Sequence, residues 1–109
     1  MVLARYLVIS AAVVAGLSCG PVQSTAYLVD AETMLDAART AQAEKLAPYE
    51  WTSANLYWHK AKEEVGYSEF EQAVDYAKKA VDFATRARDS AIKVGKRSEP
   101  AAAPEVPGQ

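Results

Sequence analysis

Residues 73–93 read AVDYAKKAVDFATRARDSAIK, three successive heptads that begin with Ala and carry Asp at the third position. The repeated alanines are Ala73, Ala80 and Ala87 on one line, and Ala77, Ala84 and Ala91 on the line beside it. Small apolar residues at alternating spacings of three and four lie on one face of an α-helix. The stretch therefore predicts a helix with a narrow alanine seam facing inward, widened by Val74 and Val81 on one side and by Tyr76 and Phe83 on the other.

The opposite face of this helix carries alternating charges. Each heptad aspartate precedes a cation by four residues, giving the pairs Asp75 and Lys79, Asp82 and Arg86, and Asp89 and Lys93. Pairs in this orientation stabilise a helix by about 0.2–0.5 kcal/mol each. Ser68-Glu69-Phe70-Glu71 resembles a capping box, and Gly95 is a typical helix stop. Together these signals predict a helix from about Glu69 to Val94.

Two earlier helices are expected before this one. Pro48 suits a first helical position, and the helix that begins there is expected to end before Gly66. Its inward line is Trp51, Ala54, Trp58, Ala61 and Val65. Another helix opens at Ser24 or Thr25 and ends near Leu46. Short connections make neighbouring helices antiparallel, so the fold class is all-α: a small antiparallel three-helix bundle or helical hairpin. Bulky residues, namely Trp51, Trp58, Phe70 and Phe83, are expected to fill the thin alanine seams.

The first twenty residues, MVLARYLVISAAVVAGLSCG, combine a basic start, an apolar run and the chain's single cysteine. This order is typical of a secretory signal peptide, and it resembles that of bacterial lipoproteins, with the large apolar residue displaced by one position. We expect removal of residues 1–18 and lipidation of Cys19, followed by a linker over residues 19–23. The alternative is an incidental thiol in an uncleaved signal. Gly20 stands where Asp would favour inner-membrane retention, so the resemblance implies a lipid anchor in the outer membrane, facing the periplasm.

The remaining chain divides into an Ala-rich helical domain over residues 24–95 and a tail over residues 96–109. The tail reads KRSEPAAAPEVPGQ and has three prolines and no periodicity, which predicts a disordered segment. The chain has 12 Lys and Arg against 14 Asp and Glu, a net charge of −2. Nucleic-acid binding requires a basic face, so no nucleic-acid partner is expected.

The chain lacks the combinations of residues that catalysis or metal binding would need. His59 is the single histidine and Cys19 the single thiol, too few for a hydrolytic triad or a His/Cys zinc site. Glu63-Glu64 and Glu69-Glu71 are read as surface acids of helices, because no glycine-containing loop accompanies them. We therefore predict no enzyme activity, no cofactor and no metal.

Several short motifs carry a resemblance to a known family. Leu46-Ala47-Pro48 opens the second helix, Ala54 and Ala61 follow within it, and Tyr67, Ala73, Ala77 and Ala80 come after a short turn. This pattern is similar to an Ala-rich helical family of envelope lipoproteins, domain of unknown function 4398, over roughly residues 31–91. The resemblance implies a helical fold and an envelope location, and it supplies no catalytic or binding residue.

Two functions from different classes remain open. Tyr49 and Leu56 lie seven residues apart, nearly opposite Trp51 and Trp58, and they are candidate partner-binding residues. The first hypothesis is a non-enzymatic lipoprotein whose helical domain binds another envelope protein or itself as an interaction or scaffolding module. The second is a peptidoglycan or small-ligand binder that uses the aromatic residues of the second helix, since aromatic rings suit sugar faces.

Overall fold

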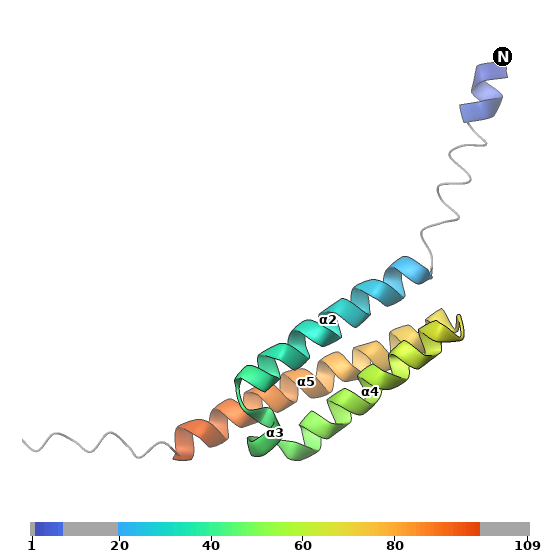
Figure 1. The fold of residues 1–109 in the computed structure, drawn as a ribbon. Helices are drawn as coiled ribbons and strands as arrows, with labels where there is room; N and C mark the ends of the chain where they lie inside the picture. The colour runs from blue at the N-terminus through green and yellow to red at the C-terminus, as the bar shows by residue number, and fades with distance from the viewer. Residues whose placement is uncertain (1, 8–19, 99–109) are drawn as a thin grey trace, which may run out of the picture.

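The computed structural model describes residues 2–7 and 20–98. Its main helices are α2 (Pro21–Thr40), α3 (Ala43–Leu46), α4 (Pro48–Gly66) and α5 (Phe70–Ser98). Helix α5 packs along both α4 and α2, whereas α2 and α4 touch each other less extensively. Helix α4 runs opposite to α2 and α5 (Figure 1). The prediction of an all-α, antiparallel three-helix bundle is thus confirmed.

The interior of the bundle consists almost entirely of alanine. Every alanine of the heptad seam has no solvent exposure. The buried apolar residues are Ala31, Leu35, Ala38, Ala43, Ala47, Ala54, Ala61, Ala73, Val74, Ala77, Ala80, Ala84, Ala87 and Ala91. Such small side chains let helix backbones approach closely while the interior stays close-packed. The predicted inward face of residues 73–93 is therefore confirmed.

The large side chains cover this seam from the sides. Trp51, Trp58, Phe70 and Phe83 are each half-buried. In the middle of the bundle, a cluster of Leu35, Ala54 and Ala84 is flanked by Met34, Trp51, Trp58 and Phe83. The expectation that bulky residues fill the interior is correct only in part, because alanines on facing helices leave no room for a ring between them.

The first helix differs from its prediction at both ends. It begins at Pro21, the N1 position, rather than at Ser24 or Thr25. The Ser24 and Thr25 hydroxyls both donate to the Pro21 carbonyl, at 3.0 and 2.7 Å, so neither caps the helix. Residues 21–23, expected in a linker, are helical. Helix α2 ends at Thr40, and Gln42 at φ 62° separates it from α3, so a single helix to Leu46 is wrong.

Helix α4 begins at Pro48 as predicted, but it includes Gly66 as its last residue instead of ending before it. The left-handed position of the following turn belongs to Ser68, at φ 61°. The Ser68 N–H donates to the Val65 carbonyl at 3.0 Å, and the Glu69 N–H donates to the Glu64 carbonyl at 2.9 Å. These two bonds form a Schellman motif that ends α4. The predicted capping box is therefore wrong, since Ser68 terminates α4 instead of capping α5.

Helix α5 continues through Gly95 to Ser98, so its predicted end at Val94 is wrong. Gly95 is half-buried, and a Cβ atom built there would lie 3.8 Å from Leu46 Cδ1. Lys96 and Arg97 occupy the last turn, where cations interact favourably with the helix dipole. Residues 96–98 thus belong to the helix, and the rest of the predicted tail lies outside the described residues.

One of the three predicted charge pairs on α5 forms as an ion pair. Arg86 Nη2 lies 2.6 Å from Asp82 Oδ2. Asp89 instead accepts from the neighbouring Arg88, at 3.0 Å. Lys79 places its Nζ over the rings of Tyr57 and Tyr76, at 5.5 and 5.6 Å from the centroids. Aromatic neighbours therefore compete for the cations that the heptad pattern assigned to aspartates.

Candidate functional site

Four aromatic rings form a continuous row where α4 meets α5. Tyr49 and Tyr57 come from α4, and Tyr76 and Phe83 come from α5. Tyr57 stacks on Phe83 with centroids 5.5 Å apart and on Tyr76 at 6.0 Å. Tyr49 meets Phe83 edge-on at 6.3 Å. We call Tyr49, Tyr57, Tyr76 and Phe83 the aromatic row.

Two cations lie along the aromatic row. Lys79 reaches over Tyr57 and Tyr76, as described above, and the Arg86 guanidinium carbon lies 4.2 Å from the Phe83 centroid. Arg86 also keeps its ion pair with Asp82. The row therefore combines apolar ring edges, tyrosine hydroxyls and positive charge. Such a surface can bury apolar anchors of a partner while pairing with its carboxylates.

The structure places the two predicted site residues on the outer side of α4. Tyr49 is 70% exposed and Leu56 is 60% exposed. Tyr49 joins the aromatic row through its contact with Phe83. Leu56 lies two turns along the same line of α4 and directly precedes Tyr57. The exposed line expected from the sequence is thus present, and it continues into a larger surface.

The rest of that surface is not predicted from the sequence. The sequence predicts Tyr76 and Phe83 on one side of the interior seam, and Tyr57 only as one of the aromatic residues of the second helix. The available signal was their spacing, seven residues between Tyr76 and Phe83 on α5 and eight between Tyr49 and Tyr57 on α4. Each spacing keeps two rings on one side of its helix. Only the pairing of the two helices shows that these sides meet.

A second aromatic surface is formed by the tryptophans of α4. Both are half-buried and each lies beside a cation. The Arg39 guanidinium carbon is 5.7 Å from the Trp51 centroid, and Lys62 Nζ is 3.7 Å from that of Trp58. The His59 ring lies 5.2 Å from the Trp58 ring. His59 is exposed.

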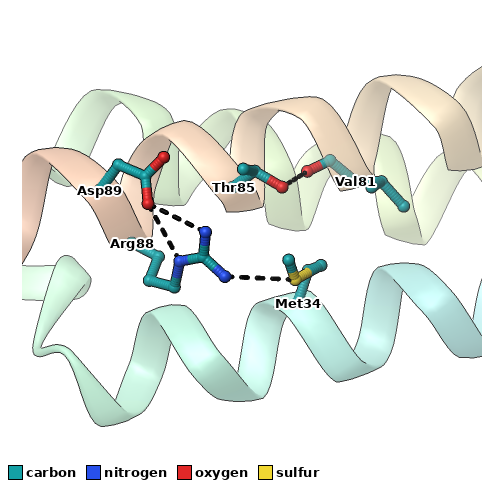
Figure 2. A network of polar contacts seen from close by, with 5 residues as sticks. All are labelled: Met34, Val81, Thr85, Arg88 and Asp89. Atoms are coloured by element: carbon teal, nitrogen blue, oxygen red, sulfur yellow. Dashed lines mark hydrogen bonds and ion pairs between the residues drawn. The ribbon is translucent and has the colours of Figure 1, made fainter.

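A polar network ties α2 to α5 on another side of the bundle (Figure 2). Arg88 donates from Nε and Nη2 to Asp89 Oδ1, both at 3.0 Å. Its Nη1 lies 3.9 Å from the Met34 sulfur. The Thr85 hydroxyl donates to the Val81 carbonyl at 2.8 Å. The Thr85 bond lies within α5, whereas Arg88 joins α5 to Met34 of α2, so we assign these contacts a structural role.

An open groove of about 340 Å³ lies where α2 and α5 begin. Its walls combine Gly20, Phe70 and Val74 with four polar or charged residues, Gln23, Glu71, Asp75 and Lys78. Within residues 2–7 and 20–98, no three His, Cys, Asp or Glu side chains gather to hold a metal ion. In the same residues, no helix combines the length and apolar character needed to cross a membrane. Cys19 lies outside the described part of the chain.

Comparison with known proteins identifies the domain. A family model described as "Domain of unknown function (DUF4398)" matches residues 26–103. The chain belongs to this family. The match includes most of α2 and all of α3, α4 and α5, so the whole aromatic row lies within the DUF4398 domain. No curated protein and no solved structure matches the chain.

Proposed function

We propose that this DUF4398 protein is a non-enzymatic interaction module of the Gram-negative cell envelope. In this proposal a lipid on Cys19 anchors it in the outer membrane, and the helical bundle faces the periplasm. The aromatic row, extended by Leu56, binds another envelope protein or a second copy of the chain.

The aromatic row is the observation that carries this proposal. Tyrosine and arginine are enriched among the residues that dominate binding energy at protein interfaces. Here three tyrosines, one phenylalanine and Arg86 gather on one surface, and Tyr49 keeps 70% of its area exposed. Single exposed apolar residues are common on proteins, whereas contiguous apolar groups with a polar rim mark interaction sites. Lys79 and Arg86 supply the charged rim and favour a partner with carboxylates.

Replacing Cys19 with Ser tests the membrane anchor. Because lipid chains are the only anchor in this proposal, the variant is expected to move from the membrane fraction to the soluble fraction. Western blots of the separated fractions measure the change. Ser18→Ala is the matched control, since it leaves the thiol in place and should keep the protein on the membrane. A Cys19→Ser protein that stays on the membrane at wild-type level would show that the anchor is elsewhere.

A photo-reactive phenylalanine at Tyr49 tests the binding surface in living cells. Illumination is expected to join the protein to its partner, giving a product of higher mass on a denaturing gel. The same group at Glu32, an exposed residue of α2, is the control for non-specific contacts. Equal products from both positions, or none from Tyr49, would contradict a binding role for the aromatic row.

Peptidoglycan binding is the second candidate, and Trp58 is the residue that favours it. Its ring is only half-buried and lies beside Lys62, so a displaced lysine would open a ring face to a sugar and could pair with a peptide carboxylate. Trp58→Ala is then expected to abolish sedimentation with purified peptidoglycan while the helical content is kept. Sedimentation unchanged from wild type would remove this candidate.

A further inference from the structure

The first half of α2 presents an uncharged outer face. Residues 21–29 read PVQSTAYLV and contain no charged side chain. Val22 is 64% exposed and Val29 is 55% exposed. The two valines lie seven residues apart and therefore share one side of the helix. Val29 precedes the buried Ala31 by two residues, so it points to almost the opposite side. Ala26 is also exposed, so a short apolar stripe points away from the bundle.

The hydroxyl groups of Thr25, on this stripe, and Thr33, just beyond it, already donate within the helix. Thr25 donates to the Pro21 carbonyl at 2.7 Å, and Thr33 donates to the Val29 carbonyl at 2.8 Å. Satisfying a hydroxyl on the helix's own backbone lowers the cost of moving it out of water. The outer face of α5 is different, because Asp75, Asp82 and Asp89 are all exposed there. The outer face of α2 over residues 21–29 could therefore enter an apolar environment without burying a charged side chain.

This stripe also lies at the end of the bundle nearest to the proposed anchor. Gly20 follows Cys19 directly, and a Cβ atom built on Gly20 would lie 3.3 Å from Phe70 Cδ2. The start of α2 and the start of α5 therefore share one end of the molecule (Figure 1). Tyr67, in the turn before α5, is 71% exposed. Tyrosine and tryptophan prefer the boundary between lipid and water. Glu69 and Glu71 are also exposed at this end, so its uncharged surface is the outer face of α2 over residues 21–29.

We propose that the outer face of α2 over residues 21–29 lies on the membrane surface when Cys19 carries its lipid. This inference rests on the proposed anchoring. The stripe is about 13 Å long and about 10 Å wide, far below the roughly 800 Å² per partner of a standard interface between proteins. A lipid on Cys19 would hold the bilayer next to Gly20, so contact with the membrane surface does not need an interface of that size. The aromatic row contains no ring from α2, so it stays free for a partner.

Site-directed spin labels test this arrangement. Cys19 is the only cysteine, and once its sulfur carries lipid, an added cysteine is the only reactive thiol. Labels at Val22→Cys and Val29→Cys are compared with a label at Thr52→Cys, an exposed position of α4. The lipidated protein is reconstituted in vesicles of phosphatidylethanolamine and phosphatidylglycerol. Collision with dissolved oxygen reports contact with lipid, and collision with a water-soluble nickel complex reports contact with water.

The two valine positions are expected to collide several-fold more often with oxygen than with the nickel complex, relative to Thr52→Cys. Ala26→Cys on the same stripe replaces either variant if its circular dichroism spectrum shows lost helix. Water contact equal to that of Thr52→Cys would overturn the inference, and so would spin–spin broadening, which indicates a second copy. An unmodified Cys19 in the mass spectrum would refute the anchoring and the inference together, whereas lipidated but water-exposed protein refutes the inference alone.

Discussion

Two faces of α5 show opposite uses of side-chain size. The inward face consists of alanines without solvent exposure, whereas Tyr76 and Phe83 lie half-buried at the boundary with α4. Small residues thus set the distance between helices, and large residues cover the seam from outside. The contrast separates the residues that define the fold from the residues available for binding, although both belong to one helix.

This separation follows from packing. An alanine loses no side-chain entropy when it is buried, and it is the best helix former. A thin seam is therefore inexpensive to form in a small domain, but it buries little apolar area per residue. Rings laid along the seam add burial, and part of each ring remains exposed to solvent. The largest apolar surfaces are consequently placed where a partner can reach them.

Ala80→Leu should have the largest effect on stability, because it inserts three carbon atoms into a position with no solvent exposure. Overpacking of this kind lowers the free energy of unfolding by about 3 kcal/mol at the upper end of its usual range. Thermal melts followed by circular dichroism measure the change. Lys93→Leu, at an exposed position of α5, is the control and should melt near the wild type. An unchanged midpoint for Ala80→Leu would place the seam elsewhere.

Tyr57→Ala should have an intermediate effect. It removes the stacks on Phe83 at 5.5 Å and on Tyr76 at 6.0 Å. Each aromatic pair contributes about 0.5–1.5 kcal/mol beyond its buried area, and partial exposure reduces the total to about 1–2 kcal/mol. Urea unfolding measures this loss in the free energy of unfolding, with Tyr57→Phe as the control that keeps the ring. A loss as large as that of Ala80→Leu would mean that the aromatic row belongs to the core.

Asp82→Asn should have the smallest effect. The pair with Arg86 is short, but the two side chains are 64% and 53% exposed. Exposed pairs on a helix contribute about 0.3–0.5 kcal/mol and are weakened by salt. Urea unfolding at low and high ionic strength should show a small difference from wild type that disappears in salt. A larger difference that resists salt would assign Asp82 a structural role in orienting Arg86 over Phe83.

The sequence predicts the regular parts of the fold well. The heptads place every seam alanine of α5 correctly, and Pro48 marks the start of α4. Both signals are local, because helical periodicity and the fixed φ angle of proline act within one or two turns. The exposed positions of Tyr49 and Leu56 follow from the same periodicity.

Helix ends and contacts between aromatic rings are harder to predict from the sequence. Gly66 and Gly95 are both helical, whereas Gln42 and Ser68 adopt left-handed conformations. Packing between helices decides where each turn falls, and it overrides the preference of glycine for these positions. The aromatic row depends on how α4 registers against α5, which no local pattern contains. Tyr57 and Phe83 therefore become neighbours only in the folded chain.

The separation of folding seam from binding surface can be tested with Leu56→Glu in protein that carries the photo-reactive group at Tyr49. We expect a thermal midpoint equal to that of the parent protein, since Leu56 is 60% exposed. We also expect loss of the cross-linked product, because a charge then enters an apolar contact. A product that persists at the parent level, or a midpoint that falls as far as that of Ala80→Leu, would contradict this separation.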